Sequence, residues 1–193
     1  MAPTVDHRSM LTPFHYRQAI RLLRRGGIVA HPTEAVYGLA CDPLDLQAVR
    51  RLLSLKGRAL EKGLILVAAR YRQIAPFVAW SEGELPERVR SGWPGPRTWL
   101  LPAADAVPWW ITGGADRVAV RVTAHPLTAE LCRRFGGPLV STSANRAGRP
   151  PARSALQVRL RCPGTDLLLH GATAGLERPT PILDATTGEV LRP

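Results

Sequence analysis

"HPTEAVYGLA", residues 31–40, follows directly on the apolar run "GGIVA". The apolar run is typical of a short buried strand, and Pro32 then imposes an extended or turn conformation. Thr33 and Glu34 would emerge at the carboxyl end of that strand, the edge at which open α/β sheets bind ligands. Gly38 would let a ligand approach the backbone closely. Pro, Thr and Gly also fit a plain turn capped by Thr33, so the stretch alone predicts either a ligand-binding edge or a turn.

Around this stretch, the spacing of apolar residues predicts helices and strands in alternation. A helix is expected over residues 12–25, with Thr12 as N-cap, and a second over residues 45–58, with Asp45 as N-cap. Further helices are expected at 71–77, 83–93 and 125–137, and strands at 27–31, 63–69, 97–103, 117–122, 138–144, 165–171, 180–185 and 189–192. The interspersed elements and the short strands of the tail predict one α/β domain over residues 1–193, with a mixed sheet covered by helices.

The composition agrees with a folded domain and adds a strong positive charge. Of 193 residues, 45% are apolar and 21% are charged, which is ordinary for a globular protein. Lys and Arg number 26 against 15 Asp and Glu, which gives a formal net charge of +11. Such a surface would attract polyanions such as nucleotides or nucleic acid. An arginine-rich composition can also reflect a GC-rich coding sequence.

The cysteines and the short apolar runs indicate a reducing, aqueous compartment. Cys41, Cys132 and Cys162 are widely spaced and form no C-x-x-C pair, so neither a disulfide framework nor a zinc site is expected. The N-terminal "MAPTVDHRSM" has no signal-peptide pattern, and the longest apolar run, "LILVAA", is too short to span a bilayer. We therefore expect a cytoplasmic protein without a membrane partner.

A second stretch, "LKGRALEKG" at residues 55–63, carries side chains suited to anions. It clusters Lys56, Arg58 and Lys62 between a predicted helix end and a predicted strand. Cations are favourable at a helix C-terminus through the helix dipole alone. The same cluster could clamp a phosphate, with Arg58 offering a bidentate fork and Lys56 a point charge.

A third stretch, "VSTSANRAGRPP" at residues 140–151, follows a predicted strand with hydroxyls and an amide. Alternation along an extended chain would turn Ser141 and Ser143 to one face, with Asn145 beside them. These groups suit phosphate or ribose oxygens, and they also suit an ordinary turn. No P-loop, Rossmann, zincin or α/β-hydrolase motif occurs in the sequence.

Taken in order, "PTEAVYGLA", "KGR" and "STSAN", with "WPGPRTWLLP" and "AVRVTAHP" between them, resemble the YrdC-like family, and in particular its short single-domain members. The resemblance runs from about Arg17 to Arg192. It implies a YrdC-like fold, an open twisted α/β sheet with a large, positively charged cavity. It also favours the ligand-binding interpretation of the three stretches over that of plain turns.

The short members of this family are threonylcarbamoyl-AMP synthases, which are nucleotidyltransferases. The resemblance implies that L-threonine, bicarbonate or CO2, and ATP give threonylcarbamoyl-AMP and pyrophosphate, with Mg²⁺ accompanying ATP; no residue is assigned as a ligand of the metal. The product would serve N6-threonylcarbamoyladenosine formation at position 37 of tRNA, through a downstream tRNA threonylcarbamoyl transferase complex. The positive charge leaves direct binding of tRNA or other RNA open.

Matched onto this sequence, the family's Lys-x-Arg and Ser-x-Asn signature implies catalytic roles for Lys56 and Arg58. The ATP-binding residues that the resemblance implies are Lys56, Arg58, Thr98, Ser141, Ser143 and Asn145. The threonine-binding residues that it implies are Thr33, Tyr37 and Arg121. Glu34 is expected to orient other groups rather than to act as a base, because a carboxylate beside an attacking anion would add repulsion.

The sequence departs from the commonest family wording at Ala35, Ala40 and Ala59, and "RPTPILD" stands where a Ser-Thr pair is frequent, which weakens the case for a phosphate contact at Thr180. The chain is expected to lack the further C-terminal domain of longer relatives.

Two other functions stay open: a basic RNA-binding or ribosome-maturation module without catalysis, and a related carbamoyl transfer. The second is disfavoured because the zinc-finger and acylphosphatase segments of those longer relatives do not occur in this sequence.

Overall fold

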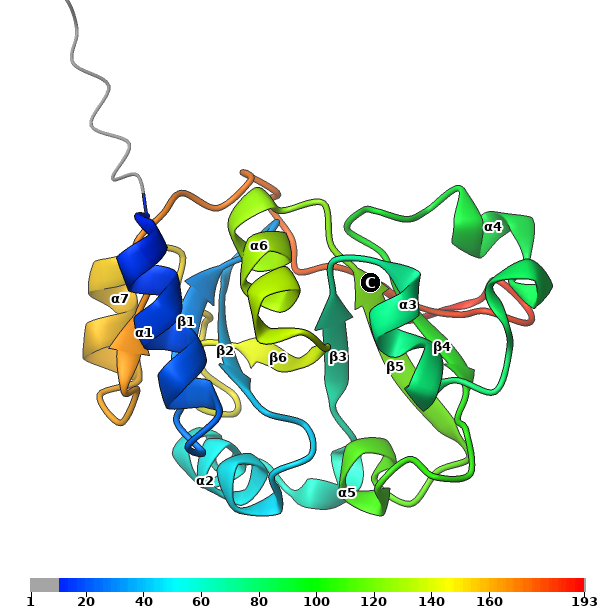
Figure 1. The fold of residues 1–193 in the computed structure, drawn as a ribbon, viewed down its shortest axis with the longest axis horizontal. Helices are drawn as coiled ribbons and strands as arrows, with labels where there is room; N and C mark the ends of the chain where they lie inside the picture. The colour runs from blue at the N-terminus through cyan, green and yellow to red at the C-terminus, as the bar shows by residue number, and fades with distance from the viewer. Residues whose placement is uncertain (1–10, 193) are drawn as a thin grey trace, which may run out of the picture.

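The computed structural model describes residues 11–192, which form a mixed sheet flanked by helices (Figure 1). The helices are α1 (Pro13–Leu23), α2 (Leu46–Lys56), α3 (Tyr71–Ile74), α4 (Glu87–Arg90), α5 (Trp109–Thr112), α6 (Pro126–Phe135) and α7 (Ala155–Arg161), with 3-10 turns at Leu60–Lys62, Ala75–Phe77 and Glu82–Glu84. The strands are β1 (Val29–Pro32), β2 (Tyr37–Cys41), β3 (Ile65–Ala68), β4 (Thr98–Pro102), β5 (Arg117–Val122), β6 (Leu139–Ser143), β7 (Leu167–Leu168), β8 (Ile182–Asp184) and β9 (Val190–Arg192). The N-terminal decapeptide "MAPTVDHRSM", for which no signal peptide is expected, lies outside the described residues.

The strands of the described chain form one sheet in the order β7-β1-β2-β6-β3-β5-β4-β8-β9. The pairs β1/β7, β3/β5 and β4/β8 are parallel, and the pairs β1/β2, β2/β6, β3/β6, β4/β5 and β8/β9 are antiparallel. The expected mixed, open α/β sheet is therefore confirmed. Within residues 11–192, no helix has both the length and the apolar character needed to cross a bilayer.

The ends of α2 follow from its sequence and fix the position of one predicted site residue. The Asp45 carboxylate caps the N-terminus by accepting the backbone N–H groups of Gln47 and Ala48, at 2.9 and 3.1 Å. Gly57 ends the helix in the left-handed conformation, with φ of 59°, which a residue without a Cβ adopts easily. Lys56 is thus the last helical residue, placed where the chain turns back toward the sheet.

Three of the helices and strands were not predicted: β2, the four-residue helix α5, and α7. No strand is predicted at residues 37–41, but β2 is buried throughout and is stabilised by pairing with β1 on one side and β6 on the other. α7 begins at Ser154, whose hydroxyl oxygen accepts the Gln157 N–H. It buries little apolar surface: Val158 is buried, whereas Leu156 and Leu160 are exposed. The preceding loop, 146–154, is irregular as predicted.

The core lies on both faces of the sheet. On one face, α1 and α6 pack side by side, in front of the strands in the view of Figure 1. They cover the strand residues Val29, Ala40, Val67 and Leu139. On the other face, α2 packs against Leu39, Leu66 and Val140. Cys41, Cys132 and Cys162 are buried free thiols within these two layers.

Candidate active site

The helices α1 and α6 cover only part of their face of the sheet, and a cavity occupies another part. Because side chains alternate along a strand, Gly38 lies on the same face as Ala40, and Ser141 and Ser143 lie on the same face as Leu139. On β5, Arg121 lies level with Val67 of β3. Gly38, Arg121, Ser141 and Ser143 all line one cavity of about 440 Å³. The central strands β2, β6 and β5 therefore supply the cavity with hydroxyls and one arginine.

Loops and the C-terminal strand complete the walls. The turn after β1 contributes Thr33, the segment after α2 contributes Arg58 and Lys62, and β9 contributes Arg192. Among the described residues, the basic side chains that line the cavity are Lys56, Arg58, Lys62, Arg121 and Arg192. The lining of the described chain contains no carboxylate. Its charge therefore suits an anionic ligand.

Lys56 joins the second and third sequence stretches. Its Nζ donates to the carbonyl oxygens of Ser143 and Asn145, the latter at 2.9 Å, and to Asn145 Oδ1 at 3.3 Å. Burial, with a smaller contribution from Arg58, lowers the pKa of Lys56 to about 8. The ammonium group therefore holds the loop after β6 in place from within the protein.

The loop after β6 is also held by its own side chains. Ser143 Oγ donates to Asn145 Oδ1 at 2.6 Å. The Asn145 amide donates to the carbonyls of Arg146 and Arg149, at 2.9 and 2.6 Å. Ser141, Ser143 and Asn145 all line the cavity, as does Thr142 between the two serines. The structure adds that Asn145 shapes the loop, a role that its sequence position did not reveal.

Arg58 lines the same cavity and keeps an unused donor. Its Nη2 donates to the carbonyls of Lys62 and Gly63, at 3.1 Å each. Its Nε is buried and has no hydrogen-bond partner among residues 11–192, as is also true of Arg121 Nε. A buried donor without a partner is costly, so both arginines are placed to gain from an anion in the cavity.

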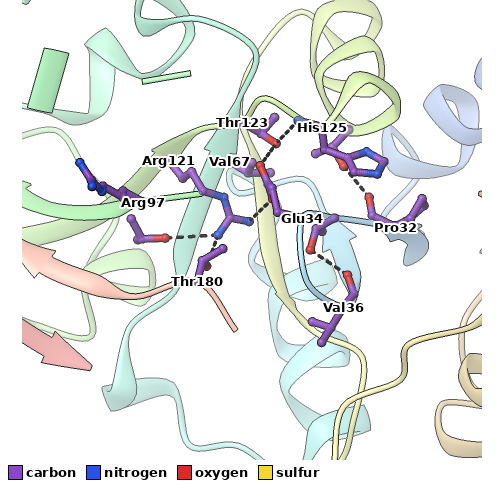
Figure 2. Close-up of polar contacts among 12 residues, drawn as sticks. Pro32, Glu34, Val36, Val67, Arg97, Arg121, Thr123, His125 and Thr180 are labelled. Atoms are coloured by element: carbon purple, nitrogen blue, oxygen red, sulfur yellow. Dashed lines mark hydrogen bonds and ion pairs between the residues drawn. The ribbon is translucent and has the colours of Figure 1, made fainter. Parts of the chain in front are cut away.

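Arg121 is the centre of a buried polar network at the cavity floor. Figure 2 shows its guanidinium between Thr180 and Glu34. Its Nη1 donates to Thr180 Oγ1 at 2.5 Å and to Thr98 Oγ1 at 3.3 Å. Its Nη2 lies 3.7 Å from Glu34 Oε2, while the Thr123 hydroxyl donates to Glu34 Oε1. Burial by itself raises the pKa of Glu34, but Arg121 and Thr123 outweigh it, so that the pKa is lowered and the carboxylate is ionised at neutral pH.

Glu34 therefore faces Arg121 rather than the open cavity, in agreement with an orienting role. The ion pair leaves Arg121 fixed but only partly neutralised, because 3.7 Å is longer than a direct hydrogen bond. An anion in the cavity would meet this arginine beside the Thr180 hydroxyl.

The remaining predicted residues divide into one that lines the cavity and two that do not. Thr33 lines it, and its hydroxyl and N–H both donate to the Val36 carbonyl, at 2.7 and 3.0 Å, which closes the turn. Tyr37 is not among the lining residues: its hydroxyl donates to the Gly171 carbonyl at 2.5 Å and accepts the Gly171 N–H at 3.2 Å. Thr98 is fully buried, and its hydroxyl accepts a hydrogen bond from Arg121, which lines the cavity.

The lining residues Thr180 and Arg192 were not predicted as site residues. The departure in "RPTPILD" weakened the case for Thr180, yet its hydroxyl lines the cavity and accepts from Arg121. Arg192 reaches the cavity because β9 pairs with β8, and its Nη2 donates to the Thr180 carbonyl at 3.3 Å. No local motif marks Arg192, so only the strand pairing could have identified it.

The sheet is open and mixed. Helices cover part of one face, and basic and hydroxyl side chains line a cavity on another part of it. These features define an α/β protein with an anion-binding cavity. The family model described as Sua5, YciO and YrdC, telomere recombination, matches residues 21–193. This chain belongs to that family. The threonylcarbamoyl-AMP synthase of Halorhodospira halophila is 56% identical over 182 residues, which cover 93% of this chain and 95% of the relative. The threonylcarbamoyl-AMP synthase of Alkalilimnicola ehrlichii is 55% identical over 183 residues, with the same shares covered.

Solved structures agree in fold. The crystal structure of P. abyssi Sua5 complexed with L-threonine superposes with a TM-score of 0.87 at 33% sequence identity. The match covers 95% of this chain and 55% of the Sua5 chain, so this chain spans little more than half of that protein. The YrdC-like architecture expected from the sequence is thereby confirmed.

Proposed function

We propose that this protein is a threonylcarbamoyl-AMP synthase, which forms threonylcarbamoyl-AMP and pyrophosphate from L-threonine, bicarbonate or CO2, and ATP. The observation that carries the proposal is that three stretches distant in sequence, around Thr33, Lys56 and Ser143, line one basic cavity. Relatives more than half identical over nearly the whole chain bear this enzyme's name. Such a name does not favour the alternative of an RNA-binding module without catalysis.

The proposed reaction explains why the cavity is built from cations and hydroxyls. CO2 adds to the uncharged amine of threonine, which gives up a proton and forms a carbamate; from bicarbonate, the same carbamate forms with loss of a water molecule. A carbamate oxygen then attacks the α-phosphorus of ATP, the bond from that phosphorus to the bridging oxygen of the β-phosphate breaks, and pyrophosphate leaves. Both reactants are anionic, so the main obstacle is electrostatic repulsion. Fixed cations that reduce this repulsion, and binding that aligns the two groups, are what such a step needs from a protein.

Residue roles follow from the contacts. Arg58 offers a buried, unpartnered Nε to a phosphate oxygen, and Lys56 keeps Ser143 and Asn145 in the positions from which they would contact the nucleotide. Arg121, fixed by Glu34 and beside Thr180, would bind the threonine carboxylate or the carbamate as a bidentate fork, with Thr33 nearby. Tyr37 and Thr98 would act by holding the wall and Arg121 in place.

Magnesium fits this site as a companion of ATP and not as a resident of the protein. Mg²⁺ prefers oxygen ligands and is usually held by carboxylates together with substrate phosphates. Among residues 11–192, no group of three or more His, Cys, Asp or Glu is placed to hold a metal, and the described cavity lining has no carboxylate. The residues present therefore do not form a magnesium site, and no step above runs through the ion.

The product is a mixed anhydride that water would hydrolyse, so it needs a prompt acceptor. We propose that it passes to a tRNA threonylcarbamoyl transferase complex that modifies adenosine 37, and that the reaction takes place in the cytoplasm.

The test is pyrophosphate release from MgATP by the purified protein, with and without L-threonine and bicarbonate, together with mass spectrometry of the nucleotide product. Release that requires both co-substrates, with threonylcarbamoyl-AMP as product, is expected. Arg58→Ala should abolish release, whereas Arg50→Ala, an exposed arginine that does not line the cavity, should not. Tight ATP binding by the parent protein without any release would refute the proposed activity.

A further inference from the structure

A second concave surface lies apart from the active-site cavity, on the outer side of α1 and α6. It has a volume of about 660 Å³, and it is lined by Arg17, Ile20, Arg21, Arg24, Arg25 and Arg134. None of these residues lines the active-site cavity. We call this surface the arginine groove, and we propose that it binds the phosphodiester backbone of a folded RNA.

The groove follows from the spacing of arginines along one helix. Arg17 and Arg21 lie four residues apart, and Arg24 and Arg25 follow by three and four residues, so all four lie on the same side of α1 and its end. All four are exposed. Among residues 11–192, no carboxylate forms an ion pair with any of them. The groove therefore carries a row of positive charge that the described chain does not neutralise.

The fifth arginine comes from α6 and forms the opposite wall. Arg134 Nε lies 2.6 Å from Glu130 Oε1, and the guanidinium lies 5.1 Å from the centre of the Tyr16 ring. Both contacts hold Arg134 in one orientation at the boundary between α1 and α6. One wall of the groove is thus fixed, while Arg17, Arg21, Arg24 and Arg25 form no ion pair with residues 11–192 and can adapt to a ligand.

Ordinary helix energetics do not explain this row. Like charges four residues apart on a helix repel each other. The helix dipole favours cations only in the last turn, which accounts for Arg21, Arg24 and Arg25 but not for Arg17 in the first half of α1. A partner that carries a regular series of negative charges would turn this repulsion into attraction.

A nucleic acid fits the row better than an anionic membrane does. Arg17 to Arg25 span roughly 12 Å at 1.5 Å per residue, a length over which one strand of a duplex presents about three to four phosphates. The guanidinium fork suits phosphate oxygens. Insertion into lipid requires a free apolar helix face, whereas the apolar face of α1 is buried: it comprises Tyr16, Ala19, Ile20 and Leu23.

Phe14 adds a contact that a folded RNA can use. It lies one helical turn before Arg17, and 61% of its surface is exposed. An exposed aromatic ring beside cations is a stacking platform for an unpaired base. The choice of RNA over DNA rests on the proposed function, whose product is consumed on a tRNA. The groove would hold RNA without obstructing the active-site cavity, because the two share no residues.

The test measures fluorescence anisotropy of a labelled RNA hairpin, of about 20 base pairs with an unpaired loop, over a series of salt concentrations. The groove variant carries Arg17→Ala, Arg21→Ala and Arg25→Ala. The matched control carries Arg50→Ala, Arg70→Ala and Arg72→Ala, which removes the same charge from exposed arginines outside the groove. We expect the groove variant to lose at least about tenfold in affinity at about 100 mM salt. The slope of its plot of log K against log salt should become less negative by about two to three. The control should change by less than about threefold.

Several outcomes would overturn the proposal. The first two are that the parent protein does not bind RNA, or that the two variants lose RNA affinity equally. A third is that the parent protein binds a DNA hairpin of the same sequence with equal affinity. A fourth is that phosphatidylglycerol vesicles displace the labelled RNA as well as unlabelled RNA does at the same phosphate concentration. Pyrophosphate release should be unchanged in both variants, because neither set of arginines lines the cavity. Failure of RNA binding is therefore distinguishable from failure of the proposed enzymatic function.

Discussion

Lys56 and Asn145 lie 89 residues apart in the chain, and one ammonium group joins them through two hydrogen bonds, to the Asn145 carbonyl at 2.9 Å and to its Oδ1 at 3.3 Å. The same ammonium also donates to the Ser143 carbonyl. The lysine of one sequence motif is thus a structural part of the other motif. Its effect on the proposed catalysis is expected to run through the geometry of the loop as well as through its charge.

Replacement of Lys56 by arginine should fail to preserve activity although the charge is kept. A planar guanidinium is larger than an ammonium and cannot direct three donors to the same acceptors in this buried position. We expect kcat/KM for ATP to fall by about 100-fold or more in Lys56→Arg, as in Lys56→Ala. Near-normal activity in Lys56→Arg would show that charge alone matters. Thermal unfolding of both variants checks that the fold is retained.

The pH profile should report the ionisation of Lys56. Its pKa is lowered from 10.5 to about 8 by burial, so the ammonium loses its proton as pH rises through about 8. A neutral amine has fewer donors for the loop, and kcat/KM should decline above that pH. Folding stability should change in the opposite direction: between about pH 8 and 10.5 the unfolded chain binds a proton that the native chain does not, so stability rises with pH. Lys56→Met should lack this contribution in urea titrations across that range.

Removal of the Glu34 charge should weaken folding. Glu34→Gln leaves the Arg121 charge buried without its carboxylate partner, which costs about 3–5 kcal/mol in comparable buried pairs. Because the folded pKa of Glu34 is lowered, its stabilising contribution is present above its unfolded value of 4.5 and disappears as pH falls through the folded pKa. The stability difference between parent and variant should therefore shrink below about pH 4.5. Urea unfolding at several pH values measures this, and a constant difference would contradict it.

Tyr37→Phe should separate a structural role from a ligand contact. The hydroxyl both donates to and accepts from Gly171, so its loss should destabilise the fold by about 1–3 kcal/mol. The KM for threonine should change less than about twofold if the hydroxyl is fully used in this contact. A large rise in the KM for threonine with unchanged stability would show that the Tyr37 hydroxyl contacts threonine. Thr33→Val serves as the comparison, since Thr33 lines the cavity.

The sequence predicted most of the fold because most elements carry local signals. The N-caps Thr12 and Asp45 and the apolar spacing of α1 and α2 place both helices within one or two residues of their observed bounds. The period-two stretch at 117–122 is β5 as expected. β2 was missed because its stability comes from two neighbouring strands, one of which, β6, lies about a hundred residues away in the chain. Short strands paired on both sides do not need a strong local pattern.

The sequence by itself determined which residue types could meet anions: the cations at and after the end of α2, the hydroxyls at the end of β6, and the turn that follows β1. These are local properties of helix ends, strand alternation and turn chemistry. Only the tertiary structure decided how they are used, because contacts between distant segments set the partners of each group. Pairing of β8 with β9 brings Arg192 and Thr180 to the cavity, and burial beside Arg121 makes Glu34 an anchor. Strand pairing and desolvation act across the whole chain, so neither can be deduced from a single stretch.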